Sequence, residues 1–164
     1  MPDATGLELL AAELGDATLE TVYFRERATL VVDPAQIRTV LGTLRAHGYA
    51  FLASVHGVDY YPEEPRLGVH YELLDMERVD RLTVKLRVPV AEPTVESVTP
   101  DWPTADHQER EIYDMFGVRF EGHPDLRRIL MPEDYEGFPQ RRDFPLGGEP
   151  VLFTYNEESY GKWQ

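Results

Sequence analysis

Residues 109–146 limit the fold of this chain more than any other part of the sequence. They begin with apolar residues at helical spacing, and the periodicity stops after Gly117. Five prolines and four glycines in residues 122–150 exclude long helices and strands there. The stretch still carries many aromatic rings, leucines and paired arginines, so it is too apolar for a solvated tail. We therefore expect an extended segment that needs a protein surface to lie on.

The preceding part of the chain has the patterns of a compact body. Clusters of β-branched and aromatic residues predict strands, and apolar residues three or four apart predict helices. Asp33 and Pro34 suit the N-cap and first turn of a helix. The predicted helices span residues 7–14, 34–46 and 105–116, and the predicted strands span residues 18–24, 28–32, 51–61, 67–74 and 81–88.

Some finer features of the body follow from single positions. Apolar and polar residues alternate at 67–74 and 81–88, which is typical of half-exposed antiparallel strands. Gly57 predicts a bulge in its strand. The proline-rich connector at 89–103 should contain one short helical turn near Val95.

These patterns predict an α+β fold, with a mainly antiparallel sheet, helices packed on one side and a long irregular C-terminal arm. Residues 1–117 should form the α+β domain, and residues 118–164 should form the C-terminal arm. A chain of 164 residues is long enough to bury one real core.

Charge and composition exclude several classes of function. The net charge of −14 disfavours nucleic acid and anionic bilayer surfaces as ligands. The chain has no cysteine, so it offers no disulfide and no thiolate ligand for zinc or an iron–sulfur cluster. No apolar run reaches the roughly 18 residues of a spanning helix, and no signal peptide is recognisable. We expect a cytosolic protein, or one attached to a membrane only through other proteins.

Three side chains of the predicted helix at 105–116 suggest a metal site. His107, Glu111 and Asp114 follow one another at i, i+4 and i+7, which could place three ligands on one face. The second histidine of a helical zinc pair is missing, so a small metal-dependent enzyme remains the alternative rather than the main prediction. The other histidines, at positions 56, 70 and 123, are more typical of strands and turns.

Acid–base catalysis has weaker support. Glu109 and Glu111 point to different sides of a helix, and the sequence has no nucleophile elbow, phosphate loop or dinucleotide fingerprint. Glu109 instead lies at the edge of an apolar stripe, where a carboxylate needs a partner. Our hypothesis is that Glu109 and Glu111 pair with arginines of the C-terminal arm. The arginines nearby in the sequence are Arg110, Arg127 and Arg128. The alternative is that Glu109 reaches solvent.

The C-terminal arm alternates apolar anchors with prolines and arginine pairs. Aromatic residues and arginine dominate the energetic centres of protein interfaces, and proline restricts the free chain before it binds. The preference for arginine over lysine also suits interfaces, although a GC-rich genome would produce the same bias. Partner binding is the main prediction. The arm could instead pack wholly on its own sheet, or exchange with a second copy of the chain.

The same stretch resembles the signature of the 30-kDa subunit family of respiratory complex I, whose members are also called the C subunit of NADH-quinone oxidoreductase. The matching motifs are Glu109-Arg110-Glu111, Tyr113-Asp114-Met115-Phe116-Gly117, the run at 122–130, Glu136-Gly137, Pro139 and the run at 141–146. His56-Gly57-Val58-Asp59-Tyr60 resembles the first strong strand of the family. Phe138 and Gln140 depart from residues common in relatives, so contacts there should differ.

The resemblance implies a non-catalytic structural subunit in the peripheral arm of a proton-translocating NADH:quinone oxidoreductase. The complex passes electrons from NADH through FMN and iron–sulfur clusters to quinone. These cofactors belong to partner subunits, and this chain should bind none. The expected partners are the D subunit and the cluster-bearing B and I subunits, at the cytoplasmic face of the bacterial membrane. Equivalent subunits of hydrogenases and of ferredoxin- or deazaflavin-linked complexes remain an alternative.

No catalytic, cofactor-binding or metal-binding residue is implied by the resemblance. The residues expected to bind partners are those of the signature: Glu109, Arg110, Glu111, Asp114, Phe116, Gly117, His123, Pro124, Arg127, Arg128, Arg141, Arg142, Asp143, Phe144 and Pro145.

Overall fold

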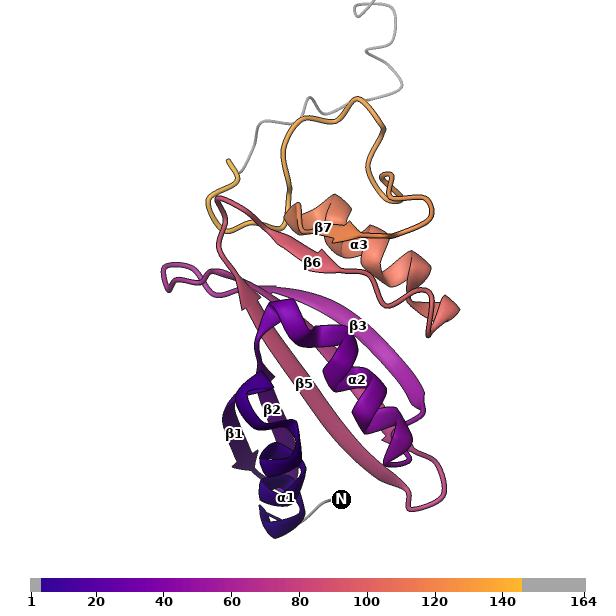
Figure 1. The fold of residues 1–164 in the computed structure, drawn as a ribbon. Helices are drawn as coiled ribbons and strands as arrows, with labels where there is room; N and C mark the ends of the chain where they lie inside the picture. Colours follow the sequence, from indigo (N-terminus) through magenta and orange to yellow (C-terminus); the bar gives the residue numbers. More distant parts are fainter. Residues whose placement is uncertain (1–3, 146–164) are drawn as a thin grey trace, which may run out of the picture.

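A computed structural model describes residues 4–145 of the chain (Figure 1). Residues 146–164 of the predicted C-terminal arm lie outside the described residues. The helices are α1 (Ala4–Leu14), α2 (Ile37–Ala46) and α3 (Asp106–Phe116), with short 3-10 turns at Gly15–Ala17, Pro34–Gln36 and Pro103–Ala105. The strands are β1 (Thr18–Phe24), β2 (Arg27–Val32), β3 (Phe51–Asp59), β4 (Leu67–Asp75), β5 (Asp80–Val88), β6 (Thr94–Glu96) and β7 (Arg119–Glu121).

The body is built on a five-stranded sheet in the order β1-β2-β5-β4-β3. Strand β2 pairs with β5 in parallel, and the other three pairings are antiparallel. The sheet is therefore mixed. Helices α1 and α2 lie on one face of it (Figure 1). The predicted α+β class, with a mainly antiparallel sheet and helices on one side, is confirmed.

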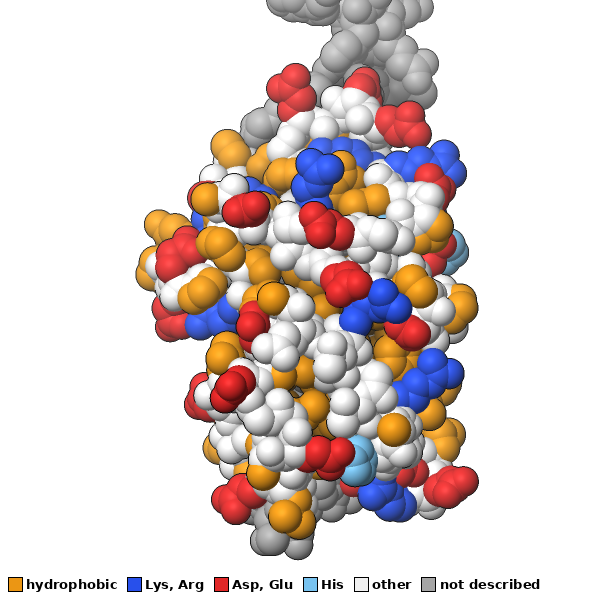
Figure 2. Space-filling model, in the orientation of Figure 1, with side chains coloured by type: hydrophobic (Ala, Val, Ile, Leu, Met, Phe, Trp, Pro, Cys, Tyr) orange, Lys and Arg blue, Asp and Glu red, His pale blue; other side chains and the backbone are white. Residues whose placement is uncertain are grey.

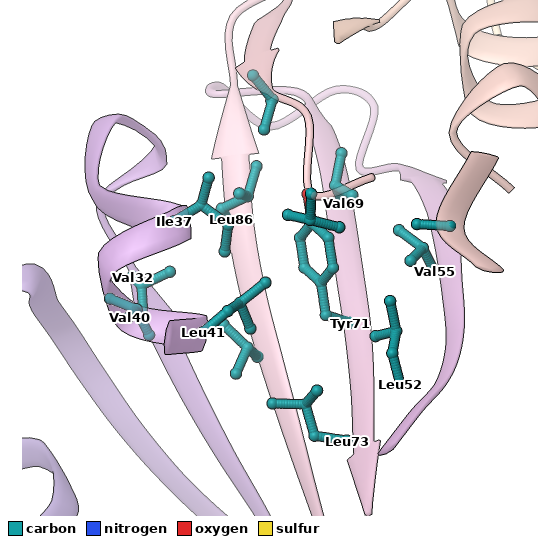
Figure 3. Close-up of a cluster of buried hydrophobic side chains, with 14 of the residues drawn as sticks. Val32, Ile37, Val40, Leu41, Leu52, Val55, Val69, Tyr71, Leu73 and Leu86 are labelled. Carbon is teal, nitrogen blue, oxygen red and sulfur yellow. The ribbon is translucent and has the colours of Figure 1, made fainter. Parts of the chain in front are cut away.

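The core lies between α2 and the sheet (Figure 3). Helix α2 buries one face completely, with no exposed surface at Ile37, Val40, Leu41 and Leu44. The facing side chains of β4 and β5 are equally buried, including Tyr71 and Leu86. Each such side chain contributes roughly 2 kcal/mol by leaving water. The predicted alternation of β5 is confirmed, because its leucines and valines all face this core.

The predicted helix start at Asp33 is also observed, with one difference. The Asp33 carboxylate accepts a hydrogen bond from the Ala35 N–H at 3.0 Å, as an N-cap should. The first turn is a 3-10 helix, however, and α2 proper begins only at Ile37.

Two finer predictions are wrong. Val95 lies in β6, which pairs in parallel with β7, and not in a helical turn. The irregular register of β3 falls between Leu52 and Ser54, and not at Gly57. Gly57 has another role, because a side-chain carbon there would lie 2.5 Å from the ring of Phe116. The glycine therefore lets α3 approach the sheet.

The strand β4 is more buried than a half-exposed strand should be. All residues from Leu67 to Tyr71 have little exposed surface. Its position between β3 and β5 in the sheet accounts for part of this burial. The prediction of a half-exposed strand is therefore wrong for β4.

The two edges of the sheet differ. At the β3 edge, the Val55 N–H donates to the side-chain oxygen of Gln108 on α3, and the Trp102 indole donates to the Ala50 carbonyl at 2.9 Å. These bonds occupy backbone groups that an open edge would present to other chains. At the other edge, β1 is exposed along nearly its whole length.

No helix within residues 4–145 is both long and apolar enough to cross a membrane.

Candidate functional site: helix α3 and the C-terminal arm

Helix α3 ends at a glycine that also makes room for the C-terminal arm. Gly117 has a φ of +77°, and its N–H donates to the Tyr113 carbonyl at 2.9 Å. A side-chain carbon at this position would lie 2.5 Å from the Phe138 ring. Glycine is therefore required twice, for the left-handed turn and for the returning chain.

Asp114 is the centre of the contact between α3 and the C-terminal arm. One of its carboxylate oxygens accepts hydrogen bonds from the backbone N–H groups of Ile129, Leu130 and Met131, at 3.0, 2.7 and 2.9 Å. The other oxygen accepts from the Arg128 guanidinium at 2.6 Å. The Asp114 side chain has no exposed surface, so these four bonds compensate for its complete desolvation.

The protonation of Asp114 follows from this geometry. Burial alone would raise the pKa of its carboxyl, but the four hydrogen bonds together outweigh burial and hold the pKa below its usual range. The carboxylate is therefore charged at neutral pH. It acts as a fixed anion around which three successive residues of the arm turn.

Two arginines of the C-terminal arm point inward. Arg128 also donates to the Gly137 carbonyl at 2.9 Å, and Arg141 donates to the Phe116 carbonyl at 2.7 Å. Both guanidinium groups lie over the Phe138 ring, at 5.5 and 4.5 Å from its centre. The Phe138 ring thus contacts both inward-pointing guanidinium groups.

A second attachment joins the end of the described arm to the main sheet. Arg66, which precedes β4, donates to both carboxylate oxygens of Asp59 at 2.7 and 2.6 Å and to both of Asp143 at 2.7 Å. The Arg142 N–H also donates to Asp59, at 2.7 Å. The Arg66 guanidinium holds the pKa values of Asp59 and Asp143 below their usual range.

Each predicted arginine pair is divided between two roles. Arg128 and Arg141 are used inside the chain, as described above. Arg127 and Arg142 lie at the surface. The Arg127 guanidinium donates to the neighbouring Asp125 carboxylate, at 2.9 Å. The guanidinium groups of Arg128 and Arg141 therefore have hydrogen-bond partners within this chain.

Glu109 is buried in a polar cluster beneath β6 and β7. It has no exposed surface, and its carboxyl accepts from the Ser97 hydroxyl at 2.6 Å and from the Val98 N–H at 2.8 Å. Burial raises the pKa of Glu109 to about 7, against the lowering effect of these two bonds. The hypothesis that Glu109 pairs with arginines of the arm is wrong, and so is the alternative that it reaches solvent.

His123 lies beside Glu109 with a completely buried side chain. Its Nε2 is 4.0 Å from the Glu109 carboxyl and 3.2 Å from the Asp106 carbonyl, which can only accept. Its Nδ1 accepts from the Asp125 N–H at 3.0 Å. These partners assign a neutral imidazole with the proton on Nε2. His123 therefore fixes the start of the arm by local hydrogen bonds.

The predicted metal site is not formed. The Asp114 carboxylate faces the arm, whereas the His107 side chain is 77% exposed and contacts Asp106. Glu111 is exposed as well. No group of three or more histidine, aspartate and glutamate side chains within residues 4–145 could hold a metal ion.

The outward side of the C-terminal arm presents apolar residues. Ile129 is 38% exposed and Leu130 is 60% exposed, and Pro124 is exposed nearby. Tyr135 and Phe144 stack on each other at 6.2 Å between ring centres. Figure 2 shows hydrophobic, basic and acidic side chains together at the end of the molecule that carries the arm.

Local sequence patterns locate the helix and the arm but not all of the residues that join them. No local pattern marks Arg66 and Asp59 as contacts of the arm, because Arg66 precedes β4, Asp59 ends β3, and both reach the arm only through the fold. Arg66 binds Asp143, 77 positions away, and Asp59 binds Arg142, 83 positions away. Asp114 stands out in the sequence, but as a candidate metal ligand.

Comparison with known proteins agrees with this architecture. The C subunit of NADH-quinone oxidoreductase from Roseiflexus sp. (strain RS-1) is 45% identical over 161 residues, covering 96% of this chain and 92% of the relative. The same-named protein of Saccharopolyspora erythraea is 45% identical, covering 92% of this chain and 63% of the relative. The model of the family described as "Respiratory-chain NADH dehydrogenase, 30 Kd subunit" matches residues 30–150.

Two solved structures share the fold. A trypsin-resistant fragment (1-134) of Nqo5 matches with a TM-score of 0.64 and 31% identity, covering 77% of this chain and all of the fragment. A chain of the membrane-bound sulfane sulfur reductase, an archaeal respiratory membrane complex, matches with a TM-score of 0.73 and 26% identity, covering 96% of this chain and 91% of that chain.

By its fold and attached arm, the chain thus belongs to a class of α+β proteins. One member of this class is a chain of a respiratory membrane complex. Within this class, the chain belongs to the 30 Kd subunit family of respiratory-chain NADH dehydrogenase. The family resemblance predicted from the residues of α3 and the C-terminal arm is confirmed.

Proposed function

We propose that this chain is a non-catalytic structural subunit in the peripheral arm of a proton-translocating NADH:quinone oxidoreductase. The complex passes electrons from NADH through FMN and iron–sulfur clusters, held by other subunits, to quinone. The chain itself carries no cofactor. Its C-terminal arm contacts the D subunit and the cluster-bearing B and I subunits, and the chain lies at the cytoplasmic face of the bacterial membrane through these contacts.

The observation that carries the proposal is the two-sided character of the C-terminal arm. The inner side is held to α3 by the buried Asp114, which accepts four hydrogen bonds. The outer side leaves Ile129 and Leu130 exposed. A segment that is fixed in shape and exposes apolar residues loses little further entropy when it binds. Such a segment is suited to bind another protein.

The outward arginines extend this surface. Arg127 and Arg142 lie at the surface on either side of the inward-pointing pair. Arginine beside exposed apolar residues is the composition of interface hot spots. The signature residues thus fall into an inner set, which shapes the arm, and an outer set, which we propose contacts the neighbouring subunits.

The state of Glu109 supports a non-catalytic role. It is the carboxyl of α3 whose pKa is raised to about 7, a value that would suit a general acid or base. Its side chain has no exposed surface, however, and is enclosed by Ser97, Val98 and His123. A substrate has no access to the carboxyl in this conformation.

The division at Gly117 into an α+β domain and a C-terminal arm remains a proposal. Val118 and Phe120 are buried, and β7 pairs with β6, so these residues stay with the body. The trypsin-resistant Nqo5 fragment matches 77% of this chain, which supports a body that folds without the final residues. Removal of the residues after Gly122 is therefore the cleaner truncation.

The proposal can be tested by charging the outer side of the arm. We expect Leu130→Asp in the full chain to reduce co-purification with the other subunits from native membranes by about tenfold or more, because burying an unpaired carboxylate in an interface should cost more than the roughly 1.4 kcal/mol that corresponds to a factor of ten. Val79→Asp is the matched control, because Val79 is 86% exposed in the turn between β4 and β5. Its co-purification should be unchanged.

Retention of the Leu130→Asp chain at the level of the control would contradict the proposal, provided both variants melt like the unmodified chain. The co-purifying subunits also decide between two kinds of complex. The likeness to the sulfane sulfur reductase chain favours, as a second candidate, the equivalent subunit of a related respiratory complex. Recovery of a flavin-bearing NADH-oxidising subunit would support the first candidate, and its absence from an otherwise intact complex would support the second.

A further inference from the structure

The main sheet has a second face, opposite α1 and α2, whose side chains form rows across the strands. The register places Glu20, Val31, Lys85, His70 and His56 in one row, and Val22, Thr29, Thr83, Glu72 and Ser54 in the next. Within the second row, the Thr83 hydroxyl donates to Glu72 at 3.0 Å. This face therefore has a polar middle, and its β1 end carries the apolar Val22 and Phe24 together with Glu20.

A hollow of about 330 Å³ lies on this face and is lined only by strand residues. Phe24 and Val22 form its apolar part and are 64% and 36% exposed. Arg27 and Lys85 bring positive charge to it, and Glu72 is its one carboxylate. The Phe24 ring is also contacted by the Arg25 guanidinium at 5.2 Å from its centre, and aromatic residues with arginine are enriched in protein interfaces.

Tyr60 and Arg87 bound the hollow at the end of the face beyond His70. The Tyr60 hydroxyl is bonded to His70 Nε2 at 2.8 Å, and the Arg87 guanidinium lies over the Tyr60 ring at 4.3 Å from its centre. Burial, followed by the charge of Lys85, lowers the pKa of His70 to about 4. His70 is neutral at physiological pH, which leaves Lys85 and Arg27 as the positive charges of the hollow.

The positive charge of the hollow contrasts with the strongly acidic character of the whole chain. The net charge is −14, so a negatively charged partner is repelled by most of the molecule. On the open face, the alternating positions of β5 carry Arg81, Lys85 and Arg87. Such a local reversal of charge determines which part of the surface can bind an acidic partner.

We propose that this open face docks an acidic segment of a neighbouring subunit, with carboxylates of the partner paired to Lys85 and to Arg27 and an apolar side chain of the partner seated on Phe24 and Val22. The inference rests on the proposed function, since it assumes that the chain is assembled with other subunits. It adds an interface separate from the C-terminal arm.

The test places the photoreactive residue p-benzoylphenylalanine at Phe24 in the full chain and irradiates the assembled complex from native membranes. We expect a cross-link from position 24 to a segment of another subunit that is rich in aspartate and glutamate. The matched control carries the same residue at Leu9, which is 69% exposed on α1. Its cross-linking to that segment should be absent.

A charge substitution at Lys85 tests whether the cross-linked segment is bound by charge or only lies near position 24. Lys85→Glu should lower the yield of the cross-link from position 24 by about fivefold, because one attractive pair becomes repulsive. Lys85→Arg should retain the yield. Both variants should melt like the unmodified chain, because Lys85 lies on the face opposite the core.

The possible failures are distinguishable. If the other subunits co-elute but position 24 gives no cross-link, or links only to lipid, to the chain's own C-terminal arm or to a segment without acidic residues, the inference is overturned and the proposed function stands. Equal cross-link yields for Lys85→Glu and Lys85→Arg would also overturn it. If the unmodified chain elutes without any partner, the proposed function fails, and the inference fails with it.

Discussion

The sheet body and the C-terminal arm of this protein differ in what holds each in place. In the body, side chains such as Leu41 and Leu86 are completely buried, and the favourable term is the removal of apolar surface from water. Where the arm meets the body, the charged Asp114 and Arg66 are buried beside the partly buried Leu126 and Met131, while Leu130 remains exposed. The comparison shows that polar contacts can fix the shape of a segment and leave its apolar residues for another protein.

The two regions should therefore respond differently to substitution. Loss of a core side chain should weaken the whole body, because the core is one continuous cluster. Loss of an anchoring carboxylate should release the arm and leave the body folded.

The largest effect is expected at Asp114. Asp114→Ala leaves the Arg128 guanidinium and three backbone N–H groups without their acceptor, which should cost the attachment of the arm about 4 kcal/mol. Amide hydrogen exchange at residues 129–131 should then become faster by two or more orders of magnitude, while the strands of the main sheet keep their protection. Exchange that accelerates equally in β4 and in the arm would show that the two regions are not separable.

A core substitution should give the opposite pattern. Leu41→Ala removes a completely buried side chain from α2 and should lower the free energy of unfolding by about 3 kcal/mol. Urea unfolding followed by circular dichroism measures this loss. Uniformly weakened protection from amide exchange in β4, β5 and α2 would support the difference between the body and the arm, and a loss confined to the arm would contradict it.

The buried Glu109 should make the stability of the folded chain depend on pH. Its pKa is raised from 4.5 to about 7 in the folded chain, so the folded state binds this proton more tightly than the unfolded state. Stability should fall as the pH rises from about 4.5 to about 7, and the cost above that range is about 3 kcal/mol. Glu109→Gln should remove this slope and raise the melting temperature at pH 8. An unchanged slope would contradict the assigned burial of the charge.

Gly117 should give the smallest of these effects. Its φ of +77° is strained for any side chain, and an added carbon would meet the Phe138 ring. Gly117→Ala should destabilise the chain by about 1–2 kcal/mol. In the double variant with Phe138→Ala, the part of the loss caused by the ring should disappear and the part caused by backbone strain should remain. Strictly additive losses would show that the ring contact is unimportant.

The parts of the fold that could be predicted from the sequence depend on local patterns. The alternation in β5 and the capping residue Asp33 each report their own surroundings, and both occur at the predicted place. The prediction for Val95 is wrong because a three-residue strand acquires its conformation from its partner β7, which follows more than twenty residues later.

In the site, too, the features with a local sequence signal are predictable and those that depend on distant residues are not. The helix α3 and its end at Gly117 are predictable, because helical spacing and a terminal glycine are local signals. The partners of its carboxylates are not. Glu109 and Asp114 are both buried, but one faces Ser97 and the other faces the arm, and helical position alone does not distinguish these environments. Arg66 contributes from outside the signature altogether.

The central claim is that the exposed apolar side of the arm is covered by another subunit. Because the chain contains no cysteine, Leu130→Cys provides a single thiol whose reaction with a maleimide can be followed by the mass of this chain. We predict rapid labelling in the isolated chain and protection in the assembled complex, with Val79→Cys labelled equally in both. Equal labelling of Leu130→Cys in the isolated chain and in the complex would contradict the account.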